Sequence, residues 1–432
     1  MLRLSTFNKF IVSVFVLLML GASRLFPEEI IKYNAQLAII VVLSIILWSM
    51  TLRSKETNLQ NEVRFLNYYF VLYVIAIAIT IYSSAKYGYS MDTILKNVVL
   101  PYSLPLASYG IVLVFNNDKS TVPLLSLVSK FVIAMLVLRM FSWVMYNFRG
   151  AIFFPRLLLQ YEGWIRDGFQ RVEAGMLFGV ALSYITVQSM QRSIRGNIHK
   201  LLLIFMLLFL LVVTRVRFQT TLSLASIVAA YVFSKSNTRG NFIFKLLSFS
   251  LIGIFFLYNY HIIESFFSLI SSQGQYGEST LVRFQGVRHY FLFMSQQHAY
   301  FGLGFLIRGN PIVEAMMARN QWSIYYLDDL GMLGTVVQLG LFTLITHGLV
   351  FVKAIRVLLK SRYLKDQSYF AFLLCLTVYL IGSNLFLNMF DGQRIFDVPF
   401  YLAIYSFMGV QIKKQISMDN KEVSKEVYGR EI

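Results

Sequence analysis

The chain has 432 residues, of which 57% are hydrophobic and only 14% are charged, and its mean hydropathy is +0.62. This composition excludes an ordinary soluble globular domain and indicates an integral membrane protein. The formal net charge of +18 is explained by a basic membrane protein and requires no nucleic-acid partner, and the single cysteine, Cys375, excludes a disulfide within the chain.

Apolar runs long enough to cross a bilayer recur along the whole chain. They predict an all-α polytopic membrane protein with about 12 transmembrane helices in a single integral membrane domain, residues 1–412, followed by a cytoplasmic tail, 413–432. The first run is interpreted as a signal anchor, because no small-residue cleavage site follows it. The predicted spans are 8–24, 35–52, 65–84, 97–115, 122–145, 173–190, 199–214, 218–234, 243–260, 331–352, 368–390 and 395–412.

The distribution of Lys and Arg places both termini inside and two large loops outside, at about 146–172 and 261–330. In this topology Lys outnumbers Arg on the inner side, whereas Arg outnumbers Lys on the outer side. Because the planar guanidinium grips phosphate with two donors at once, the outer arginines favour a phosphate or diphosphate site on the external face. Ion pairs with acidic side chains and contacts with lipid headgroups are the alternatives.

Three basic positions in the first part of the chain are candidates for that site. Arg139 lies near the outer end of the fifth predicted span, where it can join an external site. The turn between the seventh and eighth spans carries Arg215 and Arg217 with almost no loop. In an extended or broken turn both can converge on one anion, and snorkelling to lipid headgroups is the alternative.

The outer segment 261–330 carries the other polar candidates. Its middle part is predicted to be an amphipathic helix with Arg283, Arg288 and His289, which ends in a Gly-rich turn after His298. Arg283 and Arg288 are five residues apart, so they need not share a target on a regular helix.

Two adjacent carboxylates, Asp328 and Asp329, stand directly before the tenth predicted span. A carboxylate in that position can act as a general base, and it can equally cap the positive end of the following helix.

Three short motifs resemble the O-antigen polymerase and ligase superfamily. They are the Arg-led helix with the turn His-Ala-Tyr-Phe-Gly-Leu-Gly at 298–304, the span entry Asp-Leu-Gly-Met-Leu-Gly at 329–334 with Gly-Leu at 340–341, and the Thr-Arg-Val-Arg junction at 214–217. The predicted topology, with its large outer loop between the ninth and tenth helices, is also similar to that superfamily and to a GT-C-like arrangement.

The resemblance implies a glycosyltransferase in the bacterial plasma (inner) membrane, with its active site facing the periplasm or exterior. Its partners would be an undecaprenyl-diphosphate-linked oligosaccharide donor and acceptor, the lipid bilayer and a regulator of chain length, and it would need no metal or other cofactor. Residues 325–329 lack the His that the ligase branch carries before this span, which favours the polymerase branch. The expected diphosphate-binding residues are Arg139, Arg215, Arg217, Arg283 and Arg288, and the candidate general bases are Asp328, Asp329, His289 and His298.

The sequence is also compatible with functions of different classes. A flippase for lipid-linked oligosaccharides has many spans as well, although the long segment 261–330 argues against it. Two enzymes also stay open: an O-antigen ligase, and a metal-dependent glycosyltransferase that uses Glu28 and Glu29 in the first outer loop. The sugar, the linkage and the type of surface polymer do not follow from the sequence.

Overall fold

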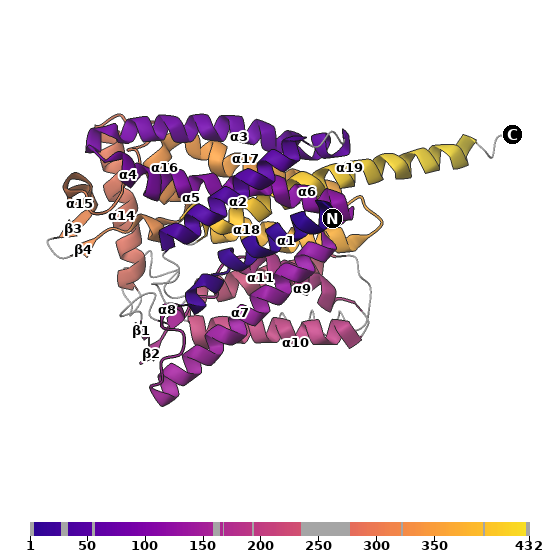
Figure 1. The fold of residues 1–432 in the computed structure, drawn as a ribbon, viewed down its shortest axis with the longest axis horizontal. Helices are drawn as coiled ribbons and strands as arrows, with labels where there is room; N and C mark the ends of the chain where they lie inside the picture. Colours follow the sequence, from indigo (N-terminus) through magenta and orange to yellow (C-terminus); the bar gives the residue numbers. More distant parts are fainter. Residues whose placement is uncertain are drawn as a thin grey trace.

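The computed structural model describes residues 4–26, 33–53, 57–158, 165–166, 168–191, 194–234, 277–320, 323–391 and 394–428. Within these ranges the chain is almost entirely helical, which confirms the predicted all-α class (Figure 1). The strands described are β1 (Ile165–Arg166), β2 (Phe169–Gln170), β3 (Ala318–Asn320) and β4 (Ser323–Ile324), which pair antiparallel as β1 with β2 and β3 with β4. The ninth predicted span, 243–260, lies outside the described residues.

The helices follow the apolar runs, with short 3-10 and π segments (labelled η) where the backbone departs from α geometry. Those before residue 235 are α1 (Leu4–Met19), η1 (Ala22–Leu25), α2 (Tyr33–Arg53), α3 (Thr57–Ser83), η2 (Ser84–Tyr87), α4 (Met91–Ile94), η3 (Leu95–Val99), α5 (Leu100–Ser103), η4 (Leu104–Ala107), α6 (Ser108–Asp118), α7 (Val122–Arg149), α8 (Pro155–Leu158), α9 (Phe178–Ser189), α10 (Ile194–Leu208), η5 (Phe209–Thr214) and α11 (Arg217–Phe233). Those after residue 276 are α14 (Gly277–Gln296), α15 (Pro311–Met317), η6 (Leu327–Leu330), α16 (Met332–Leu339), η7 (Gly340–Phe342), η8 (Leu344–Gly348), α17 (Leu349–Ser361), α18 (Gln367–Ser383), η9 (Ile395–Asp397) and α19 (Val398–Tyr428).

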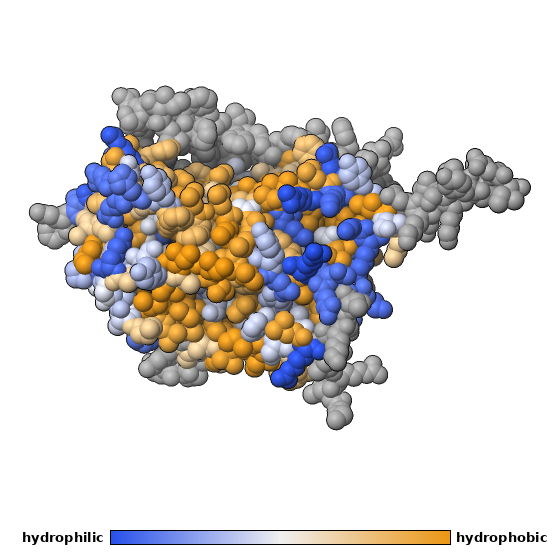
Figure 2. All heavy atoms as spheres, turned by 90° about the horizontal axis from the view of Figure 1, so that it is seen from above, coloured by the Kyte–Doolittle hydropathy of each residue, from blue (hydrophilic) through white to orange (hydrophobic). Residues whose placement is uncertain are grey.

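Several of these helices are long and apolar enough to cross a membrane. By length and composition six qualify among the described residues, and a seventh is added if a bent pair counts as one span. The six are Ala35–Arg53, Asn58–Tyr87, Met91–Asp118, Val122–Arg149, Gly196–Thr214 and Ile395–Asp419. On the face seen in Figure 2, an apolar band lies between two more polar ends. Exposed side chains such as Val71 on α3, Val137 on α7 and Leu201 on α10 belong to the large apolar side chains that face outward. The chain is therefore an all-α protein with several apolar helices that could cross a membrane.

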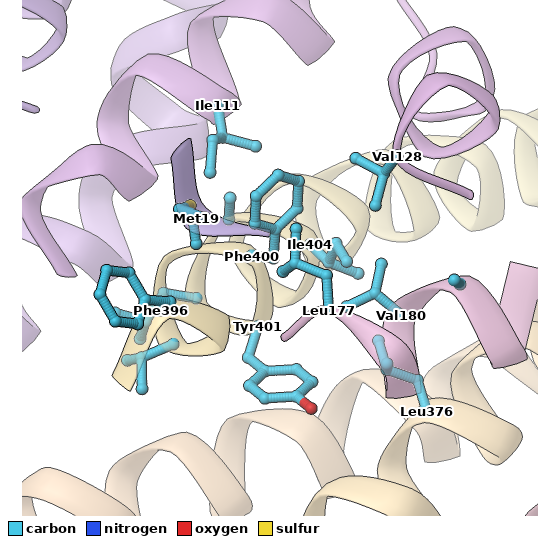
Figure 3. Packing of buried hydrophobic residues seen from close by; sticks show 14 of the residues in the cluster. Met19, Ile111, Val128, Leu177, Val180, Leu376, Phe396, Phe400, Tyr401 and Ile404 are labelled. Carbon is cyan, nitrogen blue, oxygen red and sulfur yellow. The ribbon is translucent and has the colours of Figure 1, made fainter. Parts of the chain in front are cut away.

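The core is organised around α19, whose first half is buried among helices from the whole chain. Phe400 of α19 lies near Ile111 of α6, and Ile404 of α19 lies near Val180 of α9 (Figure 3). The same helix continues to Tyr428, into the residues predicted to form a cytoplasmic tail. The central helix thus holds the N-terminal and C-terminal parts of the bundle together.

The predicted tenth span, 331–352, is not one regular helix. It is broken between Met332–Phe342 and Leu344–Ser361, which are bent by 108°. At the break Gly340 has φ +57, and a Cβ there would lie 2.2 Å from the Tyr300 carbonyl oxygen, so a side chain would collide with the backbone. The turn after α14 crosses at this point: Leu341 N donates to Tyr300 O at 3.0 Å, and Gly304 N donates to Gln338 O at 3.0 Å. These bonds satisfy backbone groups that the break removes from the helix.

The two ends of the bundle differ in content. The chain termini lie toward one end, and the opposite end carries α14, α15 and the two short hairpins (Figure 1). The polar segments singled out from the sequence therefore gather, as far as they are described, at the end away from the termini.

Candidate functional site

A cavity of about 330 Å³ lies among the polar segments at the end of the bundle away from the termini. Its charged lining consists of five arginines and three carboxylates from separate parts of the chain. They are Arg24, Arg139, Arg171, Arg283, Arg394, Glu173, Asp328 and Asp329. Five guanidinium groups against three carboxylates give the lining an excess of positive charge, which favours an anionic ligand over a cationic one.

Arg139 is the most deeply held of these cations. Its side chain reaches the cavity from α7, with only 5% of the residue exposed. Its Nη1 donates to Glu173 O at 2.7 Å and its Nη2 to Leu20 O at 3.4 Å, whereas Nε has no hydrogen-bond partner among the described residues. The approach depends on Gly175, at φ +86, because a Cβ there would lie 2.2 Å from Nη1. Two backbone carbonyls thus fix the guanidinium while one donor stays unsatisfied.

The segment between β2 and α9 forms a wall of the cavity. Arg171 Nε donates to Thr214 O at 3.0 Å, which joins this wall to the end of η5. The hydroxyl of Thr214 is buried without a hydrogen-bond partner in the described part of the chain, and Thr214 also lines the cavity. At its other end the wall is held by Asp397, whose Oδ1 accepts a hydrogen bond from Leu177 N at 2.6 Å. Two lining residues with unsatisfied buried polar atoms are what a site that binds a polar ligand or water would show.

Arg283 of α14 faces the cavity together with Asp328 and Asp329 of η6. The guanidinium of Arg283 lies 5.8 Å from the ring centroid of Phe386. Burial, together with the neighbouring charges of Asp391 and Asp329, raises the pKa of Asp328 to about 6. A carboxyl group with that pKa is mostly ionised at neutral pH and accepts a proton more readily than an ordinary aspartate.

Arg394 comes from the short linker between α18 and α19. Its guanidinium pairs with the carboxylate of Asp391, and its backbone N–H donates to Asp391 Oδ1 at 2.8 Å. Asp391 is itself buried, so the carboxylate that holds the Arg394 guanidinium is shielded from solvent. The arginine is therefore oriented by the linker before any ligand arrives.

The structure brings four of the sequence-predicted site residues into one cavity: Arg139, Arg283, Asp328 and Asp329. Arg215 ends η5 in a left-handed conformation, φ +53; its Nε donates to Val212 O at 3.1 Å and its guanidinium lies 4.4 Å from the Phe169 ring centroid.

Arg215 does not line the cavity, although its neighbours Thr214 and Val216 do. Arg288 is exposed on α14 and does not line it either, and the side chain of Arg217 lies outside what the structure describes.

The two candidate histidines lie away from the arginine cavity. His289 forms a 2.7 Å hydrogen bond between its Nε2 and Met316 O, and its ring packs against Phe293 and Tyr325. His298 is exposed at φ +49 and lines a separate, largely apolar groove beside α16. Among the candidate bases, the carboxylates are therefore the ones next to the arginines.

Three of the cavity's arginines did not emerge as candidates from the sequence: Arg24, Arg171 and Arg394. Arg24 and Arg171 sit in outer loops among other polar residues, where nothing in the local pattern sets them apart. For Arg394 a signal exists, since Asp391 and Arg394 are two opposite charges in a linker of a few residues between the last two apolar runs.

The arrangement suits the binding of a diphosphate beside a proton acceptor. Among the described residues no group of three or more His, Cys, Asp and Glu side chains is placed to hold a metal ion.

The chain matches no protein-family model, and a comparison with curated proteins finds no match.

Proposed function

We propose that the protein is a glycosyltransferase that polymerises undecaprenyl-diphosphate-linked oligosaccharide repeat units into O-antigen or a similar surface polysaccharide. It would act at the outer face of a bacterial plasma membrane, with about 12 spans and the segment 261–330 outside. The observation that carries this proposal is the cavity whose lining combines five arginines with the pair Asp328 and Asp329. The motif resemblance supplies the substrate class, and the site supplies chemistry that suits it.

In the proposed reaction a hydroxyl oxygen of the acceptor sugar attacks the anomeric carbon of the donor. The new glycosidic C–O bond forms as the bond between the anomeric carbon and the diphosphate oxygen breaks, and the diphosphate leaves with the electron pair. The proton of the attacking hydroxyl passes to a carboxylate. Charge therefore builds up on the leaving group, and fixed positive groups there lower the barrier.

The arginines would hold the diphosphate. Arg139 and Arg394 are already oriented, one by backbone carbonyls and the other by Asp391, so little reorganisation is needed when the charge develops. Arg283 is positioned to bind next to the carboxylates because it lines the same wall as Asp329.

Asp328 is the favoured general base of the two carboxylates. Its raised pKa of about 6 leaves it ionised at neutral pH and makes it a better proton acceptor than an ordinary aspartate. Asp329 would contribute negative charge that raises this pKa further, which is one of the causes of the shift.

The test is an assay with purified protein in detergent and lipid-linked repeat units, in which the products are separated on a gel. The proposal expects a ladder of polymer with the wild-type protein and with Arg288→Ala, and none with Arg283→Ala. A chelator separates this enzyme from a metal-dependent glycosyltransferase, which would lose its activity. Transbilayer movement of the lipid-linked unit in vesicles, without any ladder, would identify a flippase and refute the proposal.

A further inference from the structure

A second charged hollow, the basic groove, lies toward the end of the molecule that carries the termini. It encloses about 740 Å³. Helix α19 packs against both α3 and α17, and all three helices contribute to the lining. The cationic side chains of the groove are Arg64, Lys353, Lys360, Lys413 and Lys414.

The positive charge of the basic groove is only weakly offset. Its one carboxylate, Glu62, is 1% exposed and is bound by Gln411, whose Nε2 donates to Oε1 at 2.9 Å. Lys414 Nζ lies 4.0 Å from the same Oε1. Among the described residues no ion pair is formed by Arg64, Lys353, Lys360 or Lys413. An anion can therefore enter without first displacing a salt bridge from these four side chains.

The cations are arranged along the groove. Lys353 and Lys360 are seven residues apart on α17, so they lie on one face about two turns from each other, roughly 10 Å along the axis. Between them Val357 packs closely against α19 at Gly409. Lys353 Nζ lies 4.9 Å from the centre of the Phe65 ring on α3, so its ammonium group reaches toward the opposite wall of the groove. The spacing matches a headgroup with more than one polar contact.

The sides of the basic groove continue into an exposed apolar surface. Tyr68 and Val71 on α3 are about three-fifths exposed, and Val352 and Ile355 on α17 are also exposed. The surface seen in Figure 2 changes from apolar to polar toward this end of the molecule. A ligand that fits such a boundary has an anionic head and apolar chains, whereas a soluble anion would gain nothing from the exposed apolar sides.

We propose that the basic groove binds the headgroup of an anionic phospholipid in the leaflet beside the chain termini. The phosphate lies between the lysines of α17 and α19, and the acyl chains follow the exposed apolar residues of α3 and α17 into the membrane. This site is separate from the arginine cavity, and it does not depend on the function proposed for that cavity.

The test compares lipid binding by the purified full-length protein in detergent. Native mass spectrometry measures the retained adducts of phosphatidylglycerol and of phosphatidylcholine with identical acyl chains. The proposal expects phosphatidylglycerol to be retained preferentially by the wild type. Each lysine near an anionic headgroup contributes roughly a fivefold factor, so K353Q/K360Q is expected to weaken this binding by about twenty-five-fold.

Matched variants distinguish specific binding in the basic groove from non-specific attraction of anionic lipid to a positively charged protein. K353R/K360R keeps the positive charge in the groove and is expected to retain the lipid. Retention by this variant would also show that the protein still folds when these two positions are changed. K200Q/K365Q removes two lysines elsewhere and is expected to bind as the wild type does. Equal loss in both Gln variants, or equal retention of the two lipids by the wild type, would overturn the proposal. Displacement of the lipid by excess glycerol phosphate would do so as well, because it would mean a site for a soluble anion.

Discussion

Replacing Gly175 by Ala tests whether the position of Arg139 controls the arginine cavity. The added Cβ would lie 2.2 Å from Arg139 Nη1, and ordinary contact requires a separation more than an ångström longer. The colliding atom is the far end of a flexible side chain, so the guanidinium can move by about 1 Å while the fold persists. Misplacement of a binding group by that distance can reduce a reaction rate by about a hundredfold.

The variant also carries backbone strain, because Gly175 has φ +86 and Ala prefers negative φ. A left-handed Ala costs about 1–2 kcal/mol. Gly309 is a matched control, since it has the same φ of +86 and an added Cβ there would meet nothing within 4 Å. Both variants should lose this increment to backbone strain, Gly175→Ala should lose more because Arg139 is displaced from its two carbonyl partners, and only Gly175→Ala should lose the anion-binding geometry.

Two measurements on each protein in detergent decide the outcome. Thermal unfolding should give lowered melting temperatures for both variants, with the larger drop in Gly175→Ala, where Arg139 also loses its contacts with backbone carbonyls. Titration with inorganic pyrophosphate should show binding weakened at least tenfold in Gly175→Ala and unchanged in Gly309→Ala. If the two variants bind pyrophosphate equally, the placement of Arg139 does not govern the site and the reasoning fails.

Four further outcomes are expected. Arg283→Ala should reduce polymer formation by about a hundredfold or more, as loss of one preorganised donor does, whereas Arg288→Ala on the same helix should stay near wild type; equal effects would contradict the geometry. Because the base must be deprotonated, wild-type activity should rise with pH around an inflection near 6, and Asp328→Asn should abolish it. The raised pKa also means that the folded state holds this proton more tightly than the unfolded chain, so stability should increase as pH falls from about 7 toward 4, and Asp328→Asn should lose that increment in melts across pH. Pyrophosphate at a hundred times its Kd should stabilise the wild type by about 2.7 kcal/mol, and an unchanged melting temperature would count against an anion site.

The sequence was sufficient to predict many of the helices, because the mean hydropathy of a long apolar segment depends little on any single residue. The runs 35–52, 65–84 and 122–145 correspond to α2, α3 and α7. It was not sufficient for the run 331–352, because the break at Gly340 depends on the backbone of Tyr300, which no local pattern of hydropathy contains. The count of twelve spans stays a prediction.

The site was only partly predictable for a related reason. Position along a span was enough to single out Arg139, which lies near the outer end of the fifth predicted span. Helical spacing showed that Arg283 and Arg288 point in different directions but could not decide which one faces a cavity. That choice is made by η6 and by the α18–α19 linker, which pack around the site from distant parts of the sequence.

The residues that line the arginine cavity are held in position by long-range contacts with the backbone more than by attraction between their charges. Asp397 holds Leu177 N across 220 residues, and Arg139 is held by the carbonyls of Leu20 and Glu173. The five arginines outnumber the three carboxylates of the cavity, so part of their mutual repulsion is not offset, and contacts such as those of Arg139 hold them in place against it. In a site built in this way the charges are already assembled before a ligand binds, and the proposed diphosphate would relieve the repulsion. The structural contacts and the proposed chemistry therefore depend on the same residues, which is why a change at a glycine that contacts no ligand is the most direct test of both.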